Sequence, residues 1–194
     1  MEIFIYNRWQ NLKCKYVWLL YKELFGNIKI SKWLKEGDEI VYKYKIEYIR
    51  IEDYQNSNDD GDVIVPNDYV EKNHMEEIGV AKLLSNIIGG RIKLLTESTI
   101  DGEKMPDYLW NNKLWELKNI STKTSVDGQI RKAIKQIFKN PGGIILKLKN
   151  NNLDEKEIIS FALKRLSRVS KVIDKIDIIL IENKNVLKIY RIKK

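Results

Sequence analysis

Hydrophobic and polar residues alternate along this chain with two different periods, and the period indicates where helices and strands are expected. Apolar side chains recur at every third or fourth position, the spacing of one helix face, in residues 7–25, 68–88, 126–139 and 154–172. Turn-forming residues follow the first three stretches and are predicted to end those helices: Gly26, Gly89-Gly90 and Pro141-Gly142-Gly143. The sequence predicts strands over residues 3–6, 28–34, 40–51, 91–95, 144–148, 176–181 and 186–192.

A polar segment divides the chain into two parts. Residues 55–62 contain no apolar residue, which is typical of a solvated loop. We therefore expect a small N-terminal α/β addition, residues 1–65, whose role the sequence does not indicate, and a main domain, residues 66–194. In the main domain the expected order is helix, strand, hairpin, helix, strand. This order predicts an α+β fold with a central mixed β-sheet flanked by helices.

The hairpin is expected in residues 105–119, where strand-forming residues flank Asn111-Asn112. Asparagine tolerates the left-handed conformation that a two-residue turn requires. That turn places Asp107 opposite Glu116, and Lys118 on the same face as Glu116, because side chains alternate along a strand. Two carboxylates about 5 Å apart repel each other, so we expect a hard divalent cation between them. The alternative is a solvated outer face without a metal. The turn also predicts three further pairs: Tyr108 with Trp115, Leu109 with Leu114, and Trp110 with Lys113.

An acidic residue falls on the apolar face of the helix expected at residues 68–88. Glu77 precedes Ala81, Leu84 and Ile88 by four, seven and eleven residues, which places it in their stripe. A carboxylate there is costly unless it is paired or bound to a metal. Glu77 is therefore a candidate site residue. A shift of one residue in the helical phase would make Glu76 the candidate instead.

The helix expected at residues 126–139 carries two stripes. Ile130, Ala133, Ile134 and Ile137 form the one that faces the core. A polar stripe beside it consists of Gln129, Lys132 and Gln136, which could contact a substrate backbone or order the site. The alternative is an ordinary solvent-facing stripe.

Composition narrows the classes of function. The 194 residues include 35 Lys and Arg against 27 Asp and Glu, a formal net charge of +8 with a pI near 9.3, which favours a polyanionic partner. Cys14 and His74 are each the single residue of their type, so disulfide frameworks, cysteine- or histidine-rich zinc sites and two-histidine mechanisms are excluded. No apolar run approaches a membrane span, and the N-terminus lacks the pattern of a signal peptide. We therefore expect a protein that is cytoplasmic or delivered by some other route, and that does not bind membranes.

These residues and their order resemble the PD-(D/E)xK nuclease superfamily. Pro106-Asp107 opens the hairpin, and Glu116-Leu117-Lys118 lies on its second strand. The resemblance implies a restriction-endonuclease-like αβββαβ core with Asp107, Glu116 and the backbone carbonyl of Leu117 as metal ligands. It also implies that Lys118 positions or activates the attacking water. Glu77 would then be the additional acid that many members carry on the first helix.

Local segments are similar to one branch of that superfamily, the C-terminal tRNA-nuclease toxin domains of contact-dependent growth inhibition systems. The similarity covers roughly residues 70–150, in segments 89–95, 106–108, 115–118 and 129–136; residues 1–65 resemble no family. It implies an RNA substrate such as tRNA and a cognate immunity protein as partner. Oxygen ligands without thiolates suit Mg²⁺ or Mn²⁺ ahead of Zn²⁺.

Two other functions remain open at this level. The same fold could serve a DNA endonuclease of a mobile element or restriction-like system. It could also be a non-catalytic nucleic-acid-binding or assembly module, although the intact Asp107, Glu116 and Lys118 argue against a degenerate site. The sequence does not indicate the oligomeric state.

Overall fold

The computed structural model describes residues 44–54, 61–67, 69, 74–96, 104–149, 153–169, 173–183 and 185–194. Only the backbone is described at 14–16, 19–21, 27–30, 33–35 and 187. The helices are α1 (Ile51–Tyr54), α2 (Met75–Ile88), α3 (Lys123–Ile137) and α4 (Glu155–Leu166). The strands are β1 (Cys14–Tyr16), β2 (Leu19–Tyr21), β3 (Asn27–Ile30), β4 (Trp33–Lys35), β5 (Lys45–Ile49), β6 (Asp62–Ile64), β7 (Arg91–Leu94), β8 (Tyr108–Trp110), β9 (Lys113–Ile120), β10 (Pro141–Leu148), β11 (Lys175–Glu182) and β12 (Asn185–Lys193).

One mixed sheet organises the fold, which confirms the predicted class: α+β, with a central mixed sheet flanked by helices. Its strand order is β2-β3-β5-β12-β11-β10-β9-β8-β7-β6. Strand β10 is parallel to both β9 and β11, and β6 is parallel to β7, whereas the other neighbours are antiparallel. The predicted order of helix, strand, hairpin, helix, strand is observed from α2 to β10.

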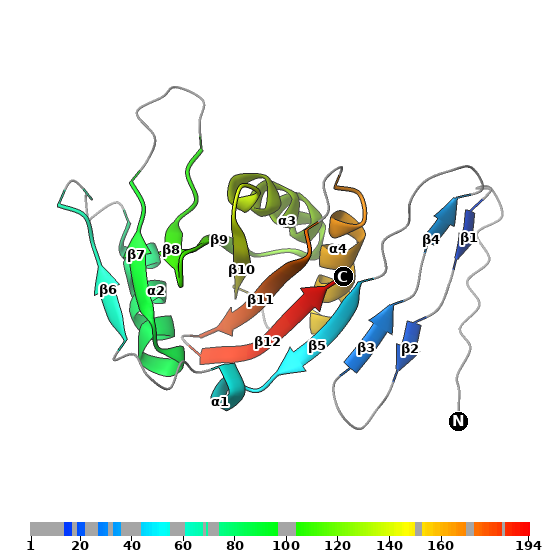
Figure 1. Cartoon of the computed structure of the whole chain (residues 1–194), viewed down its shortest axis with the longest axis horizontal. Coiled ribbons are helices and arrows are strands. Elements are labelled where there is room, and N and C mark those ends of the chain that lie inside the picture. Colours follow the sequence, from blue (N-terminus) through cyan, green and yellow to red (C-terminus); the bar gives the residue numbers. More distant parts are fainter. Residues whose placement is uncertain are drawn as a thin grey trace.

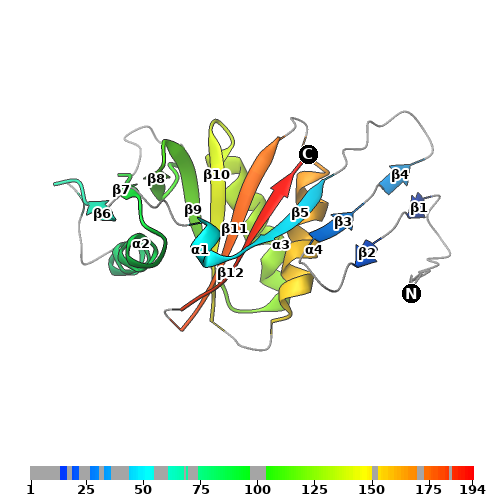
Figure 2. The same ribbon diagram turned by 60° about the horizontal axis from the view of Figure 1, so that its bottom comes forward.

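Helices cover both faces of the sheet (Figures 1 and 2). Because side chains alternate along a strand, Ile144 and Leu146 of β10 pack in the core formed with α3 and α4. Ile145, between them, packs in the core formed with α2. The described residues therefore form two apolar cores, one on each face, which fix the sheet between three helices.

The N-terminal prediction was wrong. Residues 7–25 were expected to form a helix, but β1 and β2 lie inside that range, with β2 paired to β3 and β1 to β4. Aromatic residues and Val17 between positions 16 and 21 favour strands, and the pairing of β2 with β3 and of β1 with β4 overrides the weak helical spacing. The strand predicted at residues 3–6 lies outside the described residues. The extended stretches predicted at 28–34 and 40–51 contain β3, β4 and β5.

The other helices were predicted with shifted ends. Helix α2 begins at Met75 rather than near residue 68, and α4 ends at Leu166 rather than at 172. Helix α3 begins three residues earlier than expected because Thr122 and Ser125 cap it reciprocally. Residues 141–143 do not end this helix but start β10. A Cβ atom at Gly143 would lie 2.2 Å from the Trp115 ring, so the glycine lets that indole pack against the strand.

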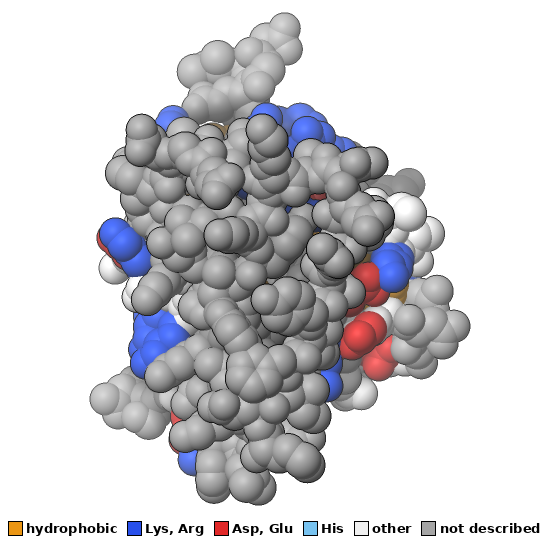
Figure 3. Space-filling view, turned by 90° about the vertical axis from the view of Figure 1, so that its right-hand side faces the viewer, with side chains coloured by type: hydrophobic (Ala, Val, Ile, Leu, Met, Phe, Trp, Pro, Cys, Tyr) orange, Lys and Arg blue, Asp and Glu red, His pale blue; other side chains and the backbone are white. Residues whose placement is uncertain are grey.

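The segment before residue 65 shares the sheet with the main domain. Strand β5 pairs with β12, and β6 pairs with β7. The boundary between residues 65 and 66 stays a prediction. Among the helices that the structure describes, none is long and apolar enough to cross a membrane. Viewed from the side of β1–β4, basic side chains gather in groups along the margin of the described surface, with acidic ones mainly on one side (Figure 3).

Candidate active site

The β8–β9 hairpin has the register that its turn predicts. Asn111 and Asn112 have φ of 52° and 57°, the positive values that a tight two-residue turn needs. Tyr108 lies opposite Trp115, Leu109 opposite Leu114 and Trp110 opposite Lys113. This local geometry determines which side chains β9 presents to each face of the sheet.

The hairpin brings Asp107 and Glu116 together. The Asp107 amide donates a hydrogen bond to Glu116 Oε2 at 3.2 Å. The Leu117 amide donates to Asp107 Oδ2 at 2.6 Å. Each carboxylate is thus held by the backbone of the other strand, so their relative position follows from the hairpin itself.

Lys118 completes a compact charged group on the same side of the sheet. Its Nζ contacts Glu116 Oε1. The Glu116 side chain is fully buried, whereas that of Lys118 is 18% exposed. Leu114 and Ile120, two residues before Glu116 and two after Lys118, pack against α3 and α4, so the group faces the α3 side. Trp115 and Leu117 point to the opposite core.

Burial raises the pKa of both carboxyl groups. Burial raises the pKa of Asp107, and the charge of Glu77 adds to this, while the Leu117 amide and the Lys118 ammonium oppose it. Burial, followed by repulsion from Asp107, raises the pKa of Glu116 to about 7, against the opposing effect of Lys118. One ammonium therefore does not compensate the buried Glu116 carboxylate and the half-buried Asp107 carboxylate beside it.

A magnesium-type ion fits this donor set. Such ions bind through one or two carboxylates and retain several waters, and Asp107 and Glu116 offer two carboxylates whose raised pKa values mark a deficit of positive charge. Across the described residues, no group of three or more His, Cys, Asp or Glu side chains lies close enough to hold a metal. A closed site of protein ligands, as for structural zinc, is therefore not formed here. The metal-binding roles of Asp107, Glu116 and the Leu117 carbonyl stay predictions.

The two acids of α2 have different surroundings. Glu76 accepts hydrogen bonds from Asn119 Nδ2 at 2.7 Å and from Lys147 Nζ at 2.5 Å. Glu77 lies 3.8 Å from His74 Nδ1, is 27% exposed, and its charge acts on Asp107. No contact joins Glu77 directly to Asp107 among the described residues. Glu77, at the end of the buried stripe, is therefore the acid on α2 whose charge affects Asp107. Glu76 is instead bound by side chains of β9 and β10.

The polar stripe of α3 lies beside the same hairpin. Gln136 Nε2 donates to the Met105 carbonyl at 3.2 Å, which ties α3 to the segment leading into Asp107. Lys132 is exposed and Gln129 half-buried. The structure thus gives Gln136 a positioning contact, while contacts of Gln129 and Lys132 with a substrate stay predictions.

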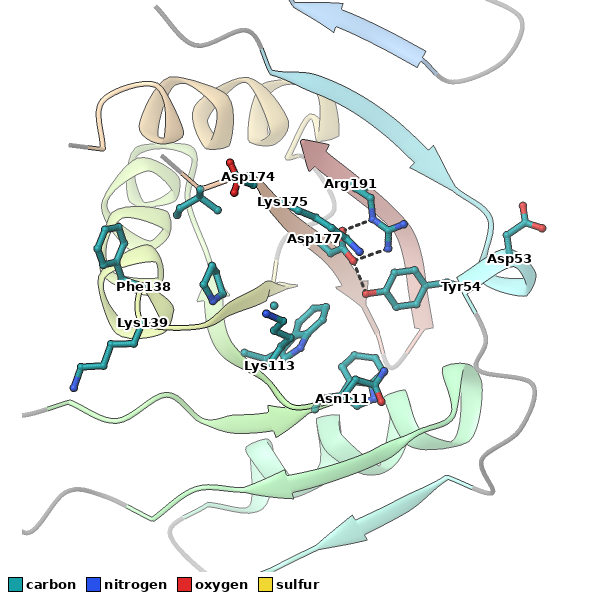
Figure 4. Close-up of a pocket in the computed structure, with 15 residues that line it drawn as sticks. Asp53, Tyr54, Asn111, Lys113, Phe138, Lys139, Asp174, Lys175, Asp177 and Arg191 are labelled. Carbon is teal, nitrogen blue, oxygen red and sulfur yellow. Dashed lines mark hydrogen bonds and ion pairs between the residues drawn. The ribbon is translucent and has the colours of Figure 1, made fainter. Parts of the chain in front are cut away.

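A second buried charge group was not predicted. Asp177 accepts from Arg191 Nε at 2.8 Å and Nη2 at 2.9 Å, and from the Tyr54 hydroxyl at 2.7 Å. Figure 4 shows Asp177, Arg191 and Tyr54 in a cavity of about 610 Å³, which Trp115 also lines. A lone acid in the apolar run of residues 176–181 was the signal available in the sequence.

Comparison with known proteins gives one similar structure. No family model matches the chain, and no curated protein matches it. Among solved structures, the CdiA-CT/CdiI toxin and immunity complex from Burkholderia pseudomallei is similar over 66% of this chain and 98% of that chain. The two chains are 14% identical, with a TM-score of 0.45.

Proposed function

We propose that this protein is a metal-dependent endonuclease of the PD-(D/E)xK type that hydrolyses phosphodiester bonds. The observation that carries the proposal is the pairing of the fully buried Glu116 with the half-buried Asp107, with Lys118 in contact with Glu116. Two opposed carboxylates with raised pKa values gain from a divalent cation more than from any other neighbour. A lysine on the same face supplies a second positive group where a phosphate would bind.

Each residue of the candidate site has a separate role in the proposed reaction. A bound Mg²⁺ would neutralise phosphate charge and lower the pKa of a water, and Asp107 and Glu116 would hold it. The Leu117 amide fixes the orientation of the Asp107 carboxylate. The Lys118 ammonium would hydrogen-bond the attacking water or a phosphate oxygen. Gln136 holds the segment before Asp107 through the Met105 carbonyl, so it acts as a positioning residue.

For the substrate we propose RNA, with tRNA as the first candidate. The preference for RNA rests on the sequence resemblance to toxin nucleases, and so does the proposal of a toxin with a cognate immunity protein. The net charge of +8 suits either nucleic acid. DNA is therefore the competing substrate in the first experiment.

That experiment incubates the full chain with total tRNA or supercoiled plasmid in Mg²⁺, in Mn²⁺ and in excess EDTA. We expect cleavage of tRNA with either metal and none in EDTA. Cleavage of plasmid alone would identify a DNA endonuclease. Undiminished cleavage in EDTA would contradict the metal mechanism, and binding without cleavage under every condition would indicate a non-catalytic module.

Lys118→Ala separates chemistry from binding. Its proposed role is in the transition state, so single-turnover cleavage at saturating RNA should fall on the order of a hundredfold. The dissociation constant should change by no more than one phosphate contact would change it. Lys132→Ala is the matched control, because it removes a charge from α3 and should weaken binding without slowing the saturated reaction. Normal cleavage by Lys118→Ala would remove the lysine from the mechanism.

A further inference from the structure

A groove between α3 and α4 combines positive charge with an apolar floor. Its volume is about 390 Å³, and we call it the α3–α4 groove. Helix α3 contributes three of its residues and the C-cap Phe138 a fourth, and α4 with the turn after it contributes three. The lining consists of Arg131, Ile134, Lys135, Phe138, Arg165, Arg168 and Val169. No acidic side chain is among these residues.

The charge of the groove is largely unneutralised. Arg165 is paired with Asp127, which accepts from Arg165 Nε at 2.6 Å. Arg131, Lys135 and Arg168 are exposed, and none of them makes an ion pair within the part of the chain that the structure describes. Three free cations around one groove attract a polyanion.

The apolar floor of the groove indicates which kind of polyanion would bind there. Ile134 is buried, whereas Phe138 and Val169 are half-buried and line the groove together with the cations. Proteins that bind single strands combine a positive groove with aromatic side chains on which bases stack. An isolated phosphate or a metal would make no use of Phe138, whereas an unstacked nucleotide uses both the charge and the ring.

The exposed surface of α3 connects this groove to the candidate active site. Successive residues in a helix are rotated by about 100°. The side chains therefore follow one another around α3 in the order Arg131, Lys135, Lys132, Gln136, about 40–60° apart. The last of them bonds Met105, two residues before Asp107, and the first lines the groove. A strand that leaves the active site over α3 meets only cationic or neutral polar side chains on this path.

We infer that the α3–α4 groove is a second nucleic-acid contact site, which binds the phosphodiester backbone of a single-stranded segment of the substrate and stacks one base on Phe138. The inference extends the proposed nuclease function by assigning a subsite away from the reacting phosphate. It predicts tighter binding of substrates with an unpaired segment beside the cleavage site. An acidic protein segment is the competing occupant.

The test measures binding of a labelled single-stranded RNA in EDTA, where cleavage does not interfere, at several salt concentrations. Arg131→Gln/Arg168→Gln should raise the dissociation constant at least about tenfold at low salt and flatten the slope of log K against log[salt] by about 1.4, the value for two phosphates. The matched control is Lys82→Gln/Lys93→Gln, which removes the same charge from exposed positions on α2 and β7. It should change both quantities much less.

Phe138 is tested separately. Phe138→Leu should weaken binding of the same RNA about tenfold by removing the stacking surface, and Phe138→Tyr should restore it. Circular dichroism and the melting temperature show whether each variant is folded, and the exposed Arg131/Arg168 variant remains informative if Phe138→Leu is not.

The outcomes separate this inference from the nuclease proposal. If the wild-type protein cleaves RNA and the arginine variant binds it like the control, the groove inference is wrong and the nuclease proposal stands. If the wild-type protein does not cleave but the arginine variant weakens RNA binding, the groove inference stands and the nuclease proposal fails. If the arginine variant loses affinity for polyglutamate and not for RNA, the groove binds an acidic protein and the inference is overturned.

Discussion

Two buried carboxylates lie two strands apart in the same sheet, and their surroundings are opposite. Asp177 on β11 is 3% exposed and is enclosed by Arg191 and the Tyr54 hydroxyl. Glu116 on β9 is fully buried and contacts one ammonium, from Lys118, while Asp107 lies against it. Asp177 is paired with a guanidinium that donates two hydrogen bonds to it. Glu116 instead shares one ammonium group, that of Lys118, with Asp107.

The pKa values of the neighbouring groups reflect this difference. The hydrogen bond to Asp177 raises the pKa of Arg191 above its usual value. Burial raises the pKa of Tyr54, and the charge of Asp177 raises it further. Around Asp177 every partner is therefore held in its usual charge state. At the other site, the pKa of the Glu116 carboxyl group itself is raised, to about 7. A satisfied buried acid indicates a structural role, whereas an unsatisfied pair of acids supports the metal site proposed here.

The largest effect should come from removing charge at the unsatisfied pair. Glu116→Gln or Asp107→Asn should reduce single-turnover cleavage in Mg²⁺ by on the order of a thousandfold, with an unchanged or raised melting temperature because repulsion is removed. Asp177→Asn is the control in the same assay. At a temperature where it is folded, it should cleave within a few-fold of the wild-type protein. If Asp177→Asn loses cleavage as Glu116→Gln does, both acids belong to one site and the contrast between them is lost.

The effects on stability should have the reverse order: Asp177→Asn should lower the free energy of unfolding more than Glu116→Gln or Asp107→Asn. Asp177→Asn leaves the guanidinium of Arg191 and the Tyr54 hydroxyl without their shared acceptor, and breaking a buried pair in this way costs about 3 kcal/mol. Urea unfolding measures this loss. The double variant Asp177→Leu/Arg191→Met should recover most of it, because removing both charges leaves no unpaired group. A double variant as unstable as the single one would show that packing, not charge, governs this position.

The pH dependence of stability sharpens the comparison further. Burial and the charge of Asp107 raise the pKa of Glu116 from its ordinary 4.5 to about 7 in the folded protein, and EDTA keeps metal ions away in this measurement. A raised pKa in the folded state favours folding when the group is protonated. The contribution is therefore complete below about pH 4.5 and is lost as the pH rises through about 7. Wild-type stability should fall across this window, on the order of 2 kcal/mol relative to Glu116→Gln.

Two controls accompany that measurement. Asp177→Asn should retain the same pH-dependent fall, because Glu116 is intact in it. Mg²⁺ should stabilise the wild-type protein above pH 7 and stabilise Glu116→Gln less, since a ligand that binds only the folded state adds to stability. Parallel curves for wild type and Glu116→Gln in EDTA would show that Glu116 ionises normally.

The sequence predicted the β8–β9 hairpin because the information that determines this hairpin is local. The turn at Asn111 and Asn112 sets the register, and the register places Asp107 against Glu116 without reference to any other part of the chain. Helix α3 was predicted for the same reason, since its core stripe is contained in one segment. What the sequence could not supply is the effect of burial on these charges, because burial depends on how α3 packs over β9.

The Asp177 group could not be predicted, because its register depends on an irregularity. Strands β11 and β12 form a hairpin, but the pairing shifts between Leu180 and Ile181, and this shift brings Asp177 opposite Arg191. A regular hairpin counted from the pair Ile181–Val186 would have placed Tyr190 there instead. Tyr54 comes from far along the chain. The prediction of an N-terminal helix was wrong for a similar reason. Strands β2 and β3 pair with each other, and periodicity alone does not identify which segments pair.

The smallest effect concerns the two acids of α2. The charge of Glu77 raises the pKa of Asp107 without touching it, so Glu77→Gln should weaken Mg²⁺ binding about tenfold, the size of a modest charge interaction. Stability should change little, because Glu77 is partly exposed and its neighbour His74 lies 3.8 Å away.

Glu76→Gln disturbs the contacts with Asn119 and Lys147 instead. It should lower stability by about 1 kcal/mol and leave metal affinity nearly unchanged. Calorimetric titration of Mg²⁺ and urea unfolding of the two variants measure both quantities. If the metal effect follows Glu76 and not Glu77, the acid on α2 that serves the site is Glu76, and the assignment of Glu77 is wrong by one residue.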